Sequence, residues 1–283
     1  MLNQSPRYYV PEPSTWPICG SFALLSMAFG AATWFNGVGW GKYLVFAGLL
    51  LLFYMLAGWF STVAHESEGG KYNKQVDVGF RWGMGWFIFS EVMFFAAFFG
   101  ALFYMRVISI PDLGQLESQQ LIWPGFKPEW PTAGPGITEQ FTPMGAWGIP
   151  ALNTLILLTS GATVTWAHWG LLKNNRSQLI WGLAMTVVLG ILFIAFQAYE
   201  YAHAYGDLNL KLTMGAYGWT FYMLTGFHGF HVTIGTIMLL VILFRSVAGH
   251  FRPEHHFGFE GVAWYWHFVD VVWLGLFIFV YWL

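Results

Sequence analysis

Residues 80–99 read FRWGMGWFIFSEVMFFAAFF, and this stretch decides the fold class. Its only ionisable residues are Arg81 at the start and Glu91 in the middle. A helix needs about 20 apolar residues to cross the hydrocarbon of a bilayer, so the stretch predicts a transmembrane helix. The alternation of polar and apolar residues that membrane β-strands need is absent.

Six further stretches of similar length and apolarity lie on either side, which gives seven predicted transmembrane helices in all. They are Ile18–Phe35, Tyr43–Val63, Trp82–Tyr104, Ala151–Leu172, Leu179–Tyr201, Trp219–Phe244 and Val262–Trp282. Unpaired backbone groups are costly in lipid, so we expect an all-α membrane protein, a seven-helix bundle.

The composition agrees with a membrane protein. Hydrophobic residues make up 57% of the 283 residues and charged residues 9%, whereas soluble domains carry about 25% charged residues. A formal net charge of −2 leaves no basic surface, which excludes nucleic-acid binding. Cys19 is the only cysteine, so the chain cannot form an internal disulfide, an iron–sulfur cluster or a thiolate-bridged copper pair.

The spacing of the predicted helices divides the chain into two helices followed by five. We expect an N-terminal tail and two-helix arm over residues 1–63, a charged inner loop over 64–81, and a five-helix bundle over 82–283. A long outer segment rich in Pro and Gly, at about residues 107–150, interrupts this bundle.

The basic residues predict the orientation, because cytoplasmic loops carry the excess of Lys and Arg. Eight belong to the N-terminus and the loops after the second, fourth and sixth helices: Arg7, Lys71, Lys74, Arg81, Lys173, Arg176, Arg245 and Arg252. Four belong to the other side: Lys42, Arg106, Lys127 and Lys211. We therefore expect a cytoplasmic N-terminus and a periplasmic C-terminus.

Charged residues inside a membrane helix are costly and are therefore candidates for function. Glu91 follows Trp82 by nine residues, which places it about 13 Å into the bilayer, near its middle. It is either a proton-handling or lipid-associated acid, or a neutral acid that ties helices together, and the sequence leaves both open. Asp270 has His267 one turn earlier on the same face, and we interpret them as a structural polar pair.

Other histidines and acids do not complete a ligand set for a metal or haem. We interpret His228 and His231, three residues apart on the sixth predicted helix, as helix-packing residues. Glu200 and His203 form one E-x-x-H, but a di-iron site needs a second copy and two further Glu residues, so we attribute it to chance. The histidines of predicted loops should face solvent or the membrane interface: His65, His255 and His256. We expect the isolated chain to bind neither metal nor haem.

Beyond residues 80–99, four more long motifs follow in order. They are LNTLILLTSGATVTWAH at 152–168, FQAYEY at 196–201, TGFHGFHVTIGT at 225–236 and HHFGFEGVAWYWHFVDVVWL at 255–274. Together these motifs resemble cytochrome c oxidase subunit III, and the resemblance runs from about Trp59 to the C-terminus.

The resemblance implies a seven-helix bundle split two plus five by a V-shaped cleft that holds phospholipids. In that family haem and copper lie in subunits I and II, and subunit III packs against subunit I, so no cofactor besides bound phospholipid is expected here. The resemblance makes Glu91 the family's intramembrane acid and places Trp59, Arg81 and Arg245 at positions associated with cleft lipids. An Arg or Trp at a helix end also suits a lipid phosphate and glycerol.

Two features depart from the family pattern. The segment Met105–Pro150 is longer than in mitochondrial members, and a His–His pair is reduced to His168–Trp169. These leave the contacts of the outer loop open. The length and the loop are more similar to proteobacterial members, so we expect a bacterial inner membrane, with the mitochondrial inner membrane as the alternative.

The expected function is that of a non-catalytic core subunit of a proton-pumping cytochrome c oxidase in aerobic respiration. It would stabilise subunit I, hold structural phospholipid and support proton uptake. The alternatives are a subunit III-like component of a quinol oxidase or nitric oxide reductase, and a stand-alone membrane transporter, which Glu91 and Asp270 would also suit.

Overall fold

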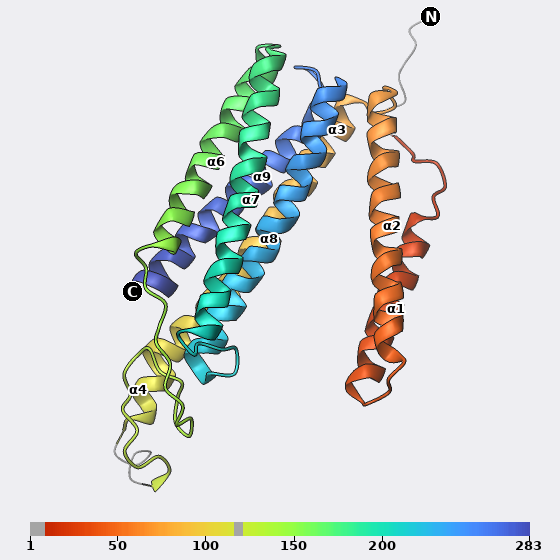
Figure 1. The fold of residues 1–283 in the computed structure, drawn as a ribbon. Coiled ribbons are helices and arrows are strands. Elements are labelled where there is room, and N and C mark those ends of the chain that lie inside the picture. Colours follow the sequence, from red (N-terminus) through yellow and green to blue (C-terminus); the bar gives the residue numbers. More distant parts are fainter. Residues whose placement is uncertain (1–8, 116–120) are drawn as a thin grey trace, which may run out of the picture. The chain divides into compact units, whose positions relative to one another are not determined.

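The computed structural model describes residues 9–115 and 121–283, and every long element in these ranges is a helix. Seven helical spans are long and apolar enough to cross a membrane, which confirms the predicted number and class. The elements are α1 (Trp16–Phe35), α2 (Gly41–Glu68), α3 (Lys74–Phe103) with its extensions η1 (Tyr104–Ser109) and α4 (Ile110–Leu113), α6 (Ile149–Leu172), α7 (Arg176–Gly206), α8 (Gly215–Ala248), and α9 (Phe257–Leu276) with its extension η2 (Phe277–Trp282) (Figure 1).

The charged segment expected as a loop over residues 64–81 is mostly helical. Because α2 continues to Glu68 and α3 begins at Lys74, only residues 69–73 lie between them. Charged side chains at helix ends can reach water while the backbone stays hydrogen-bonded. In the connection, Lys71 Nζ lies 3.1 Å from Glu12 Oε1. This hydrogen bond raises the pKa of the Lys71 ammonium above its usual value.

The chain divides into two compact units, Met1–Phe80 and Arg81–Leu283, in agreement with the predicted division into two helices and five. In the first unit α1 and α2 pack against each other, and their buried residues are nearly all small: Gly20, Ala23, Gly30, Gly41, Gly48 and Met55. Small residues let the two backbones approach closely, which is how helices associate where lipid weakens the hydrophobic driving force.

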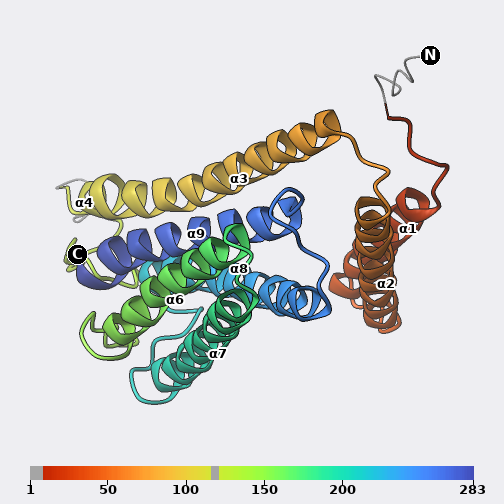
Figure 2. The same ribbon diagram turned by 90° about the horizontal axis from the view of Figure 1, so that it is seen from above.

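In the second unit α6, α7, α8 and α9 lie side by side, and α3 runs along α9 (Figure 2). Large aromatic side chains join α3 to this group. Phe94 meets Phe227 of α8 with ring centroids 5.0 Å apart, and Phe95 meets Phe268 of α9 at 6.1 Å. The position of α3 therefore depends on side chains rather than on close backbone contact.

Two tryptophans of α9 form the centre of the second unit. Trp266 and Trp273 are fully buried. Their indole N–H groups donate to Ser160 Oγ and Thr154 Oγ1 of α6, each at 2.9 Å. A buried indole N–H needs an acceptor, and these two bonds fix the register of α9 against α6.

The outer loop between α4 and α6 docks on the start of α8. The backbone N–H groups of Ala216 and Tyr217 donate to the carbonyls of Ala133 and Thr132, at 3.0 and 3.1 Å. Phe141 stacks on Tyr217 with ring centroids 5.3 Å apart. The first N–H groups of a helix have no partner inside the helix, so the loop caps α8 from outside.

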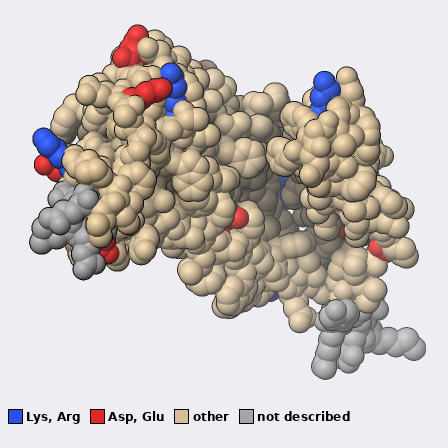
Figure 3. Space-filling model, turned by 90° about the horizontal axis from the view of Figure 1, so that it is seen from below, with Lys and Arg blue, Asp and Glu red and all other residues tan. Residues whose placement is uncertain are grey.

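Large apolar side chains cover the outside of the helices. In the apolar 18-residue stretches of α1 and α2, only 17% and 11% of the residues are buried inside the protein. In the last span the share is 50%. Figure 3 shows charged side chains, single or in small groups, separated by broad surface without Lys, Arg, Asp or Glu. So large an apolar exterior suits lipid or a protein partner rather than water.

Two basic residues of the second unit contact the ends of neighbouring helices. Arg81 pairs with Glu260 near the start of α9, and Arg176 donates to the carbonyl of Ser246 near the end of α8. Arg7, which entered the orientation argument, lies outside the described residues. Which side is cytoplasmic therefore stays a prediction.

We predict that Gly182→Ala destabilises the protein, because α6 and α7 touch at this position. A Cβ on Gly182 would lie 2.7 Å from Cβ of Ala167. The expected loss is about 1–3 kcal/mol, the usual cost of overpacking a core, measured as a lower midpoint of thermal unfolding in detergent. Gly100→Ala is the matched control, because nothing lies within 4 Å of that position on α3. Equal midpoints for the two variants would contradict the prediction.

Candidate functional site

Glu91 on α3 contacts His231 on α8. Glu91 Oε2 and His231 Nε2 lie 2.9 Å apart, with side chains 20% and 11% exposed. The rings of Phe94 and Phe95 lie 6.0 and 5.0 Å from the imidazole, centroid to centroid. Sequence analysis singled out both residues but did not pair them, because they are far apart in the chain.

The hydrogen bonds of His231 restrict where its protons lie. Nδ1 is 2.6 Å from the carbonyl oxygen of Phe227, which can only accept, so Nδ1 carries a hydrogen. Either a neutral His231 accepts from a protonated Glu91, or an imidazolium donates to a carboxylate. In both states one proton lies between Nε2 and Oε2. The pair can therefore hold a proton and also fasten α3 to α8.

Asp270 and His267 lie near each other on α9, but they do not form a hydrogen bond. Oδ2 of Asp270 is 3.7 Å from Nδ1 of His267, which is beyond hydrogen-bond range. Each side chain turns toward α6 instead: Asp270 fills the space beside Gly161, where any side chain would collide with it, and His267 Nε2 lies 3.2 Å from Thr165 Oγ1. Both residues therefore contact α6 and form part of the interface between α6 and α9.

His228 makes a different contact from His231. It is fully buried on α8, and its Nε2 donates to the carbonyl of Val269 on α9 at 3.2 Å. The ring of Trp273 lies 5.1 Å away, centroid to centroid. The two histidines of TGFHGFH thus join α8 to two different helices and do not share a centre.

Glu200 and His203 also have separate partners. Glu200 is 1% exposed and accepts from the Tyr281 hydroxyl at 2.6 Å. His203 Nδ1 lies 2.6 Å from Asp207 Oδ2. Tyr281, which sequence analysis did not consider, connects η2 to α7 through this bond. A lone Tyr near a C-terminus carries no sequence signal of such a contact.

The lipid candidates fall in both units. Trp59 is on α2 of the first unit, 45% exposed. In the second unit, the guanidinium of Arg81 lies 5.6 Å from the Phe257 ring centroid and that of Arg245 lies 4.7 Å from the Phe251 ring centroid. Each guanidinium therefore lies beside an aromatic ring near the start of α9.

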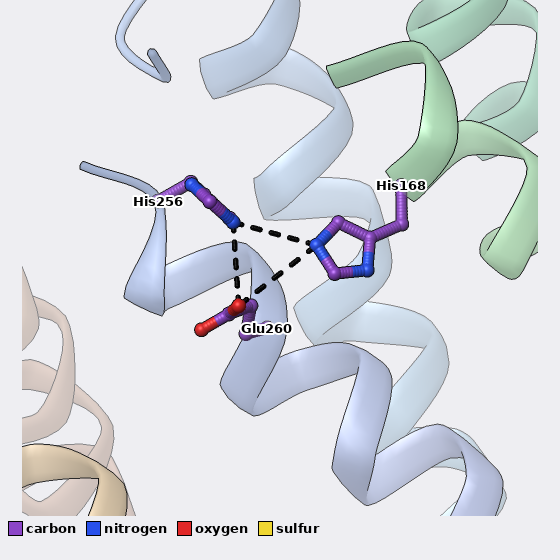
Figure 4. A group of neighbouring side chains, drawn as sticks. All are labelled: His168, His256 and Glu260. Atoms are coloured by element: carbon purple, nitrogen blue, oxygen red, sulfur yellow. Dashed lines mark hydrogen bonds and ion pairs between the residues drawn. The ribbon is translucent and has the colours of Figure 1, made fainter. Parts of the chain in front are cut away.

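The prediction that His256 faces solvent or the interface is wrong. It is 8% exposed and occupies the N-cap position of α9. Its Nε2 lies 3.3 Å from Glu260 Oε1 and 3.4 Å from His168 Nε2 (Figure 4). Glu260 is a residue that sequence analysis missed. The available signal was its spacing of four residues from His256, just ahead of the predicted helix Val262–Trp282.

The other two histidines of predicted loops are exposed, as expected. His65 belongs to α2 rather than to a loop, with Nδ1 2.7 Å from the carbonyl of Ser61. His255 forms an isolated antiparallel bridge with Arg252, which turns the chain into α9. His256, the next residue, is buried.

The fold and these contacts define a multi-pass helical membrane protein in which several polar side chains pair across helix interfaces. The comparison of the chain with family models identifies which one. The model of the family Cytochrome c oxidase subunit III matches residues 6–283, so the chain belongs to this family.

Curated relatives agree over the full length. The chain is 42% identical over 283 residues to "Cytochrome c oxidase subunit 3" of Scyliorhinus canicula, covering 100% of this chain and 99% of the relative. It is 44% identical over 275 residues to the protein of that name from Prototheca wickerhamii, covering 97% and 96%. The relative from Marchantia polymorpha is 41% identical over 282 residues, covering 99% and 98%.

We predict that Glu91→Leu destabilises the protein and that Glu91→Gln does not. Leucine leaves Nε2 of His231 without a partner, which costs about 1–3 kcal/mol for a buried polar atom. The amide of glutamine can still donate to the neutral imidazole. Thermal unfolding in detergent measures both. If Gln destabilises as much as Leu, the pair is held by opposite charges and not by a neutral acid.

Proposed function

We propose that this chain is the non-catalytic subunit III of a proton-pumping cytochrome c oxidase in aerobic respiration. The observation that carries the proposal is the family match over residues 6–283. Membership of this family means a place in a complex with the other oxidase subunits. In the proposal, subunit I is the main contact and subunit II belongs to the same complex, and these two hold the haem and copper.

The apolar exterior supports a role inside a larger assembly. Helices α1, α2 and α3 expose many large apolar side chains, among them Phe22, Phe46, Trp82 and Trp86. In a membrane these surfaces are covered either by lipid or by helices of a partner. The proposed role is to brace subunit I and the lipids between subunits.

The described polar groups are suited to holding helices together rather than to carrying electrons. One pair is also suited to a role in proton supply. The Glu91–His231 pair holds one proton within a membrane span, and no further titratable partner is bonded to Glu91 Oε2 among the described residues. We propose that Glu91 is mainly a neutral acid that ties α3 to α8 while the subunit supports proton uptake by the complex.

The proposed location is a bacterial inner membrane, with the N-terminus in the cytoplasm. The excess of Lys and Arg on one set of loops supports this orientation. A quinol oxidase or nitric oxide reductase component, or a stand-alone transporter, would have to show its activity without cytochrome c or in liposomes without partners. The relatives named cytochrome c oxidase subunit 3 favour the oxidase.

We predict that Arg81 and Arg245 retain phospholipid. Guanidinium groups form bidentate bonds with phosphate, and both lie beside the start of α9, where aromatic rings flank them. Native mass spectrometry of the purified complex should show less retained phospholipid for the double variant Arg81→Ala, Arg245→Ala. Lys173→Ala, an exposed cation at the end of α6, is the matched control. Unchanged lipid in the double variant would remove both residues from this role.

We predict that electron transfer continues when the subunit is removed. The initial rate of oxygen reduction should stay largely intact, while activity is lost faster during turnover because subunit I is no longer braced. If the subunit also supports proton entry, the initial rate should fall more steeply as pH rises, since protons become limiting. Oxygen consumption by complexes with and without the subunit measures both effects. An immediate loss of most activity would contradict the bracing role.

Glu91→Gln tests the role of this acid in proton transfer, with Glu139→Gln in the outer loop as control. We expect near-normal oxidase activity and proton pumping in both variants. Loss of a proton-transfer group typically lowers a rate by about 100-fold or more. A loss approaching that size in Glu91→Gln, with assembly and lipid content unchanged, would show that Glu91 conducts protons.

A further inference from the structure

Three potential metal ligands meet between α6 and α9. Nε2 of His256 lies 3.3 Å from Glu260 Oε1 and 3.4 Å from His168 Nε2, and the distance from His168 Nε2 to Glu260 Oε1 is 3.9 Å. The three atoms point toward one another in Figure 4. Each can present a lone pair, so they converge as acceptors on a common point.

The fold holds these side chains on rigid elements. His168 lies in the last two turns of α6, His256 occupies the N-cap position of α9, and Glu260 follows one turn later on the same face of α9. The side chains are 26%, 8% and 15% exposed respectively. The group is therefore mostly shielded, but an ion can reach it from the surface through His168.

The spacing of the three atoms suits a small divalent ion. Zinc binds imidazole nitrogen and carboxylate oxygen at about 2.0–2.2 Å in a tetrahedron, which requires ligand atoms about 3.3–3.5 Å apart. Two of the three observed distances, 3.3 and 3.4 Å, fall in this range, and the third, 3.9 Å, needs a shift of about half an ångström. Two histidines and one glutamate leave a fourth position open.

A hydrogen-bonded cluster without an ion accounts less well for this arrangement. At 3.4 Å the two Nε2 atoms make at best a long hydrogen bond. Nδ1 of His256 is buried and has no hydrogen-bond partner among the described residues, so the polar contacts of this ring are made by Nε2. An ion on the shared side of the three atoms would satisfy all of them at once.

Arg81 limits the affinity without occupying the site. Its guanidinium binds Oε2 of Glu260, which leaves Oε1 directed toward the histidines. The arginine fixes the carboxylate, and its positive charge also repels a cation nearby. Such a site should exchange its ion with the solution rather than hold it permanently.

We propose that His168, His256 and Glu260 bind one divalent transition-metal ion, best matched by zinc, which links the end of α6 to the start of α9. Sequence analysis predicted no metal ligand set in this chain, and the proposal departs from that prediction. The proposal does not rest on the function proposed above. Zinc is redox-inactive, so an ion at this site would take no part in electron transfer by the complex.

The test uses the full-length chain in detergent micelles, stripped with a chelator and dialysed against zinc. We expect one zinc per chain by elemental analysis, and at least tenfold weaker binding in His256→Gln and in Glu260→Gln. His255→Gln is the matched control, because this neighbour is exposed and lies outside the cluster. Zinc should also raise the thermal unfolding midpoint of the wild type and of His255→Gln, but not that of His256→Gln.

A second measurement on the wild type does not depend on whether the variants fold. X-ray absorption at the zinc edge should show two imidazoles and oxygen ligands at about 2.0–2.1 Å. The absence of a stoichiometric ion, a spectrum without imidazole, or equal binding by wild type and a folded His256→Gln would each overturn the proposal.

Discussion

Polar side chains inside this bundle must find their partners within the protein, because the surrounding hydrocarbon offers none. In the second unit four bonds between helices meet this requirement for the groups they join: Trp266 to Ser160, Trp273 to Thr154, His231 to Glu91 and Tyr281 to Glu200. Hydrogen bonds between membrane helices contribute only about 0.6 kcal/mol each on average, so their main effect is on register. A misaligned helix would leave several buried polar atoms unpaired, and each such atom costs more than the bond provides.

The two units meet the same requirement differently. The first unit has few polar side chains between its helices, and α1 and α2 associate through glycines and an alanine. Most of its surface stays available to lipid or to another subunit. The second unit buries its aromatic and polar residues in a core centred on α9. This difference suits a subunit with one part that packs as an independent bundle and another that contacts its surroundings.

Several charged groups of the second unit gather at the start of α9. Glu260 binds Arg81 through one oxygen and faces two histidines with the other, and Arg245 lies close by on the Phe251 ring. Lipid phosphate and a metal ion are distinct ligands, but Arg81 connects the two proposed sites because it touches both. A metal ion bound beside Oε1 of Glu260 would therefore change the electrostatic field at Arg81, which binds Oε2.

The sequence by itself determined the number of transmembrane helices, the family and the division into two helices and five, because apolar length and motif order are local properties of the chain. Glu91 was recognised for the same reason, since its depth follows from counting residues along one helix. Only the tertiary structure decided the partners: that Glu91 meets His231, that Asp270 and His267 turn toward α6, and that His256 is buried beside His168. These contacts join residues about 90 to 140 positions apart, and they depend on the rotation and register of packed helices. No local pattern records those two quantities, because any of several faces of a uniformly apolar helix can point inward.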